Sequence, residues 1–105
     1  MFAGRDRLWS VLDELREQHG ELLIVEGGAT GADSLAREWA VATKSHVEQF
    51  KADWTRYGRS AGPIRNQRML TDGAPDLVVA CEGGKGTADM VRRARAAGIR
   101  IVEVP

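Results

Sequence analysis

The sequence predicts an α/β fold in which a mostly parallel sheet of four or five strands lies between two layers of helices. Short apolar runs alternate with amphipathic segments, a pattern typical of a parallel sheet with helices on both faces. Glycine-rich turns follow two of the apolar runs, at residues 27–31 and 83–87. Because the carboxyl ends of parallel strands meet at one edge, both turns are expected at the edge where such sheets bind ligands.

The N-terminal half alternates helices with strands. Asp6 is expected to cap a helix over residues 6–18, which Gly20 ends. A strand over residues 21–26 leads into the first turn, and Asp33 or Ser34 starts a second helix. Apolar residues recur at helical spacing in both helices: Leu8, Val11, Leu12 and Leu15, then Leu35, Ala36, Trp39, Ala40 and Val41.

The C-terminal half continues the alternation. After a strand over residues 47–51, residues 52–61 have no clear period and are expected to form an ordered loop. Pro63 suits the first turn of a helix over residues 64–70. The remaining elements are a strand over 76–81, a helix over 87–97 ended by Gly98, and a strand over 99–104.

One feature does not fit this alternation. Only Met1-Phe2-Ala3 precedes the turn at residues 4–6, so the first strand is unusually short. In a Rossmann-like strand order the first strand lies in the middle of the sheet, and a short one leaves a central gap in hydrogen bonding. Three explanations stay open: the short strand suffices, a neighbouring chain helps, or the start codon is not the true one.

Composition indicates one soluble domain over residues 1–105. Fifteen basic residues balance fifteen acidic ones, which argues against a surface that coats nucleic acid. Cys81 is the only cysteine and lies in an apolar run, so no disulfide framework exists and a reducing cytoplasm is the expected location. No run of about 18 apolar residues and no signal-peptide core is present, so no membrane contact is expected.

The first turn combines glycines with two polar side chains. Gly27, Gly28 and Gly31 permit positive φ and a close approach of ligand to the main chain, and Thr30 can donate its hydroxyl to a phosphate. Asp33 either caps the following helix or holds a ribose hydroxyl or a metal. A purely structural tight turn is the alternative for the whole segment.

The second turn is Gly83-Gly84-Lys85-Gly86-Thr87. It lacks the four-residue spacing of a phosphate loop between its first glycine and a Gly-Lys-Ser/Thr ending, so it is not a Walker motif. Thr87 can still cap a helix or bind phosphate, and Lys85 adds a positive charge.

The densest polar segment covers residues 52–66. Trp54 is expected either to stack on a base or to fill the core under the loop. Arg65 and Asn66 are expected in the first turn of a helix, where Arg65 can bind phosphate through two hydrogen bonds. Asp53 and Gly62 complete the candidates of this segment.

Other conspicuous residues are expected to be structural. Trp9 and Trp39 fall on amphipathic helices and suit a core or an interface. Neither His19 nor His46 has a second histidine or cysteine at metal-ligand spacing, so no metal site is expected.

Residues 27–33, 52–66 and 83–87 together resemble the YspA-like branch of the SLOG superfamily. That superfamily is Rossmann-like, occurs in bacteria and their phages, and includes the LOG enzymes, the DprA proteins and the YpsA proteins. Gly4-Arg5 matches its first-turn pattern, whereas the short first strand departs from it. The resemblance implies a site for a nucleotide or a nucleotide derivative, with Gly4 and Arg5 added to the binding residues; no cofactor beyond this ligand is expected.

Catalysis is less clearly implied. LOG enzymes cleave a base from ribose 5′-monophosphate with a Gly-Gly-x-Gly-Thr-x-x-Glu motif, and Met90 stands here at the position of the glutamate. We therefore expect a binding domain, a sensor or a sequestering protein, that self-associates as a homodimer or higher. The alternative is a nucleotide-processing hydrolase with Asp33, Asp53 or Asp89 as acid or base; the balanced charge argues against a DprA-like role on single-stranded DNA.

Overall fold

The computed structural model of the protein describes residues 4–28 and 31–105. In chain order its elements are α1 (Arg5–His19), β1 (Leu23–Glu26), α2 (Ala32–Thr43), β2 (His46–Gln49), α3 (Trp54–Tyr57), the short 3-10 helix η1 (Gly58–Ser60), α4 (Ala61–Thr71), β3 (Leu77–Cys81), α5 (Lys85–Ala96) and β4 (Arg100–Val104). The predicted alternation of helices and strands is confirmed.

The strands are parallel, and in the described part of the chain they form two separate pairs. β1 lies beside β2 with Leu23 opposite His46, and β3 lies beside β4 with Leu77 opposite Arg100. β1 and β3 do not pair with each other, so the expected single sheet of four or five strands is not continuous here. The expected short first strand, at residues 1–3, lies outside the described residues.

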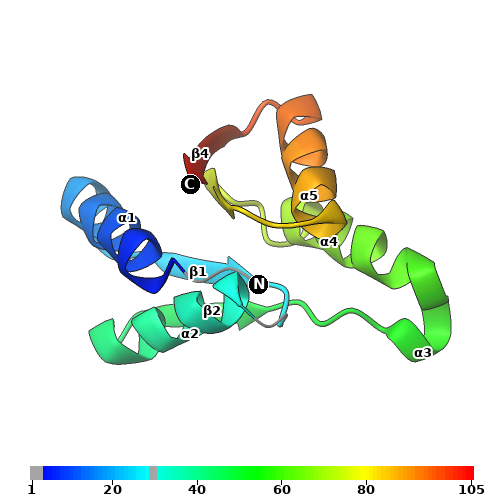
Figure 1. Cartoon of the computed structure of the whole chain (residues 1–105), viewed down its shortest axis with the longest axis horizontal. Helices are drawn as coiled ribbons and strands as arrows, with labels where there is room; N and C mark the ends of the chain where they lie inside the picture. The colour runs from blue at the N-terminus through cyan, green and yellow to red at the C-terminus, as the bar shows by residue number, and fades with distance from the viewer. Residues whose placement is uncertain (1–3, 29–30) are drawn as a thin grey trace.

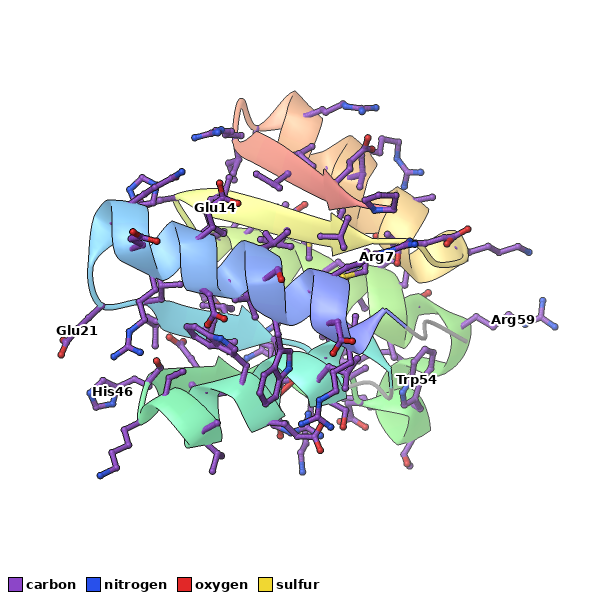
Figure 2. All side chains as sticks on the ribbon, turned by 60° about the vertical axis from the view of Figure 1, so that its left-hand side comes forward. Arg7, Glu14, Glu21, His46, Trp54 and Arg59 are labelled. Atoms are coloured by element: carbon purple, nitrogen blue, oxygen red, sulfur yellow. The ribbon has the colours of Figure 1, made fainter. Side chains whose placement is uncertain are left out.

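The elements are arranged in three layers. Figure 1 shows α1 and α2 on one side of the strands and α4 and α5 on the other. In Figure 2, α1 crosses in front of the space between β1 and β3, and the arrows of β1, β3 and β4 run the same way. Their carboxyl ends, and the turns that follow them, therefore lie at one end of the molecule.

The core lies under α1 and α2. Trp39 is fully buried, and its indole Nε1 donates a hydrogen bond to Asp13 Oδ1 at 2.8 Å, which ties α2 to α1. Trp9 binds the same two helices, because its Nε1 donates to the Leu35 carbonyl at 3.1 Å. The buried cluster consists of Leu8, Leu12, Ile24, Trp39, Ala40, Cys81 and Val104.

Several local predictions are corrected. Residues 54–60 are not a loop but form α3 and η1, because the Asp53 carboxylate accepts a hydrogen bond from the Arg56 amide and caps α3. α4 begins at Ala61, earlier than expected. Asp6 does not cap α1; the cap position is Gly4. Val41, expected on the apolar face of α2, is 78% exposed.

Candidate functional site

Most of the candidate residues gather around one cavity. It has a volume of about 1780 Å³, and it is lined by the ends of β1 and β3 and by the starts of α1, α2 and α5, with Arg65 and Asn66 of α4 beside them. The predicted site residues that line it come from both glycine turns, from α1 and from α4: Gly4, Arg5, Gly31, Asp33, Arg65, Asn66, Gly83, Gly84, Gly86 and Thr87. Met90 lines it as well.

Arg65 and Asn66 connect the two glycine turns; they were expected in the first turn of a helix, but they lie in the second turn of α4 because that helix begins at Ala61. The Arg65 guanidinium donates from one terminal nitrogen to the Gly27 carbonyl at 2.8 Å and from Nε to Asn66 Oδ1 at 3.0 Å. The Asn66 amide donates in turn to the Gly86 carbonyl at 3.2 Å and to Asp89 Oδ2 at 3.0 Å. One pair of neighbouring side chains thus fixes both turns relative to each other.

The first turn is braced by two carboxylates. Glu26, the last residue of β1, is only 2% exposed and accepts a hydrogen bond from the Gly28 amide at 2.6 Å. Asp33 does not cap α2, whose cap position is Gly31; it accepts from the Gly27 amide at 3.1 Å. The Gly27 and Gly28 amides therefore already have acceptors within the protein. An anion at this turn would have to bind to the amides at the start of α2 instead.

The Glu26 carboxylate has further partners that sequence reasoning missed. Arg37 of α2 donates to both of its oxygens, at 3.1 and 3.2 Å, and Gln49 of β2 donates at 2.6 Å. The available signal was a charged residue at the end of an apolar strand directly before a glycine, since such a charge is buried only when it is paired. Its partners lie 11 and 23 residues away in the chain.

At two glycines, the space that a Cβ would take is occupied by another side chain. A Cβ on Gly27 would lie 2.5 Å from an Arg65 guanidinium nitrogen, and a Cβ on Gly83 would lie 2.5 Å from Thr87 Oγ1. The Thr87 hydroxyl therefore sits against the second turn. Both glycines are explained by close approach rather than by an unusual backbone angle.

Asp89 belongs to an ionic cluster on α5. It is buried and accepts hydrogen bonds from Asn66, Arg92 and Arg93. Burial raises the pKa of this carboxyl, but the hydrogen bonds from Asn66 and Arg93 and the charges of Arg93 and Arg92 outweigh burial, so that the pKa is lowered overall. Asp89 is therefore ionised and suited to hold Asn66 in place, and it is poorly suited to donate a proton.

The pKa of Cys81, which precedes the second turn, is affected by Asp33, which follows the first turn. The thiol is buried at the end of β3. Burial raises its pKa, and the negative charge of Asp33 raises it further. Cys81 therefore keeps its proton at neutral pH and packs as a small apolar residue.

Other candidates lie away from the cavity or are engaged elsewhere. Trp54 is 60% exposed, so it does not fill the core; its ring lies over the start of α4, 3.3 Å from where a Gly62 Cβ would be. Asp53 caps α3, and the guanidinium of Arg5 lies 4.4 Å above the Trp9 ring. Lys85 is exposed at the start of α5. Thr30 lies outside the described residues.

Two general features concern the described residues only. No group of three or more histidine, cysteine, aspartate or glutamate side chains within residues 4–28 and 31–105 could hold a metal ion. Among the same residues, no helix is both long and apolar enough to cross a membrane.

Comparison with known proteins gives two matches. The model of the YspA, cpYpsA-related SLOG family matches residues 1–57. The "Gene 61 protein" of Mycobacterium phage D29 is 37% identical over 110 residues, which cover 97% of this chain and 87% of the phage protein. No solved structure matches the chain.

Proposed function

The chain belongs to the YspA, cpYpsA-related SLOG family, and on that basis we propose that it binds a nucleotide or a nucleotide derivative at the cavity mouth. The observation that carries the proposal is the Arg65–Asn66 pair, which ties both glycine turns to the second turn of α4. The starts of α1, α2 and α5 and residues of both turns line one opening, as expected of a phosphate site in an α/β fold.

The phosphate would bind to backbone N–H groups and to Arg65. The first amides of α2, from Gly31, and of α5, from Lys85, have no acceptor within their own helices, and they lie at the positive end of the helix dipole. A guanidinium has five N–H donors, and two of those of Arg65 are used by Gly27 and Asn66. The remaining donors and the Thr87 hydroxyl can contact a phosphate or a ribose.

A role in binding, as a sensor or a sequestering protein, fits the side chains better than hydrolysis. Asp89 is held by Asn66, Arg92 and Arg93, and its lowered pKa makes it a poor proton donor near pH 7. Met90, next to it on α5, lines the cavity and carries no proton-transfer group. The proposal is therefore a single nucleotide-binding domain that keeps its ligand intact.

The test is thermal denaturation with AMP, ADP, a cyclic nucleotide and ADP-ribose, followed by titration calorimetry of the strongest. For a dissociation constant of about 10 μM, 1 mM ligand stabilises the fold by about 2.7 kcal/mol. Arg65→Gln should abolish that gain. Arg68→Gln is the matched control, because Arg68 is an exposed cation on the same helix that does not line the cavity.

Two results would overturn the proposal. One is the absence of stabilisation by every compound at 1 mM. The other is equal loss in Arg65→Gln and Arg68→Gln, which would indicate nonspecific attraction of an anion by positive charge. Release of free base or phosphate during the titration would move the assignment to the hydrolase.

A further inference from the structure

The balanced total charge of the chain is distributed unevenly over the layers of the fold. Residues 54–71, which form α3, η1 and α4, carry four arginines and no acidic residue. α5 carries four basic residues and one acidic residue, Asp89, which is buried. α1 and α2, on the other side of the strands in Figure 1, together carry four basic and six acidic residues. The side of the molecule formed by α4 and α5 is therefore strongly positive, and we call it the basic side.

Acidic partners compensate only part of the charge on the basic side. Arg92 and Arg93 share a single carboxylate, that of Asp89. Arg68 lies 3.7 Å from the Asp72 carboxylate, in a pair whose two side chains are both more than half exposed. An exposed ion pair of this kind is weak in water, so it leaves the guanidinium able to bind another anion.

An open groove lies between α4 and α5 on the basic side. Its volume is about 540 Å³, and it is lined by Gln67 of α4 and by Arg92, Arg93, Ala96 and Ala97 of α5. The Arg93 guanidinium donates to Gln67 Oε1 at 3.0 Å and so joins the two helices across the groove. The Arg92 side chain is 70% exposed, so the N–H groups that do not contact Asp89 are open to solvent. The groove therefore combines arginine donors with two small side chains that leave room for a ligand.

We propose that this groove binds the phosphate backbone of a single-stranded nucleic acid. Planar guanidinium groups bind phosphate through paired hydrogen bonds, and every cation of the basic side except Lys85 is an arginine. An acidic protein is a poorer fit, because stable protein interfaces are centred on large buried side chains and the groove offers only the methyl groups of Ala96 and Ala97. Interfaces with nucleic acid are instead polar and positively charged.

Exposed aromatic side chains on α3 favour a single strand over a duplex. Trp54 is 60% exposed and Tyr57 40% exposed, and Figure 1 shows α3 at the outer end of α4. In the part of the chain that the structure describes, no ion pair involves Arg56 or Arg59, which flank Tyr57. Unpaired bases can stack on such rings, whereas the bases of a duplex are already stacked. α4 is about 16 Å long, which about five nucleotides span at about 3.4 Å each.

The groove is separate from the proposed nucleotide site. None of the five residues that line the groove lines the cavity between the glycine turns. Arg92 can also be replaced without dismantling the cluster on α5, because Asp89 keeps its hydrogen bonds from Asn66 and Arg93. The inference therefore does not depend on the proposed function.

The experiment measures the fluorescence anisotropy of a labelled oligothymidylate of about 20 nucleotides with the full chain, between about 50 and 200 mM salt. Two phosphate contacts, by Arg92 and Arg93, predict a slope of log K against log salt of about −1.4 or steeper. Arg92→Gln should weaken binding about fivefold at about 0.1 M salt and make the slope shallower by about 0.7. Arg16→Gln is the matched control and should change the affinity less than about twofold, because Arg16 is an exposed cation of α1 on the other side of the strands. Trp54→Ala should weaken binding about fivefold or more.

Comparison ligands separate the possible occupants. A duplex of the same length and an oligoglutamate peptide of similar charge should each bind about tenfold or more weakly than the single strand. Equal affinity for the peptide, tighter binding of the duplex, or equal weakening in Arg92→Gln and Arg16→Gln would overturn the proposal. A millimolar excess of AMP should leave the oligonucleotide bound; its displacement would place the strand in the cavity and overturn the groove assignment. Failure of AMP to bind at all would refute the nucleotide site and leave the groove result intact.

Discussion

Replacement of Glu26 by glutamine tests how the first glycine turn is held. In the native protein one carboxylate oxygen accepts from the Gly28 amide and from Arg37, and the other accepts from Gln49 and from Arg37. A glutamine amide has one NH₂ group, and in either orientation that group faces donors. The least costly arrangement turns the Gln49 amide over, but Arg37 then faces an NH₂ group and has lost its countercharge.

The expected loss follows from these contacts. A buried donor without an acceptor costs about 1–3 kcal/mol. The lost ion pair adds less than about 1 kcal/mol, because Arg37 is 37% exposed and can be hydrated. The two terms together are about 1–4 kcal/mol, so at about 4 °C per kcal/mol for a domain of this size Glu26→Gln should lower the melting temperature by about 4–16 °C.

The assay is thermal denaturation followed by circular dichroism, with Glu48→Gln as control. Glu48 lies on the adjacent strand β2 but is exposed, so its substitution should change stability by less than about 0.5 kcal/mol. Equal melting temperatures of the two variants would refute the view that Glu26 is a structural brace.

Four further substitutions are expected to change stability with opposite signs or in a pH-dependent way. Gly27→Ala should destabilise the fold by about 1–3 kcal/mol, because the new Cβ would displace Arg65 from the Gly27 carbonyl. Gly86→Ala should stabilise the fold by about 0.5–1 kcal/mol, because Gly86 lies in α5 with open space around its Cβ position. Denaturant titration of both variants measures the two changes. Because the pKa of Asp89 is lowered in the folded state, its contribution to stability is present above its unfolded pKa and is lost as the pH falls below about 4. Asp89→Asn should therefore reduce stability at pH 7. Its melting temperature should also fall less than that of the native protein between pH 7 and pH 2.5. The raised pKa of Cys81 has the opposite effect on stability: above about pH 8.5 the unfolded thiol ionises before the native one, so the free energy of unfolding should fall with rising pH. This fall should be less steep in Cys81→Ala. The prediction is contradicted if the native protein loses no more stability than Cys81→Ala between pH 8 and 10.

The sequence predicted the features that depend on short-range pattern and on the geometry of parallel strands. Residues 22–25 and 77–81 are apolar runs followed by glycine-rich turns, and parallel strands place such turns at the same end of the molecule. Trp39 recurs at helical spacing with other apolar residues of α2, and it is fully buried.

The features that the sequence did not predict depend on distant partners or on very short elements. Glu26 is buried only because Arg37 and Gln49 fold onto it. α3 has four residues, too few for a helical period to be visible. The division of the described strands into the pairs β1-β2 and β3-β4 was not predicted either, because strand pairing joins segments far apart in the sequence.

The most direct test of the nucleotide site is a two-dimensional NMR titration of the labelled protein with AMP and ADP-ribose. The site described here predicts that amide shifts change first at Gly31, at residues 83–87 and at the Arg65 side chain, and that β2 and the C-terminal half of α1 stay unchanged. Unchanged spectra at millimolar ligand, or changes centred on α3 and β2, would contradict a phosphate site between the two glycine turns.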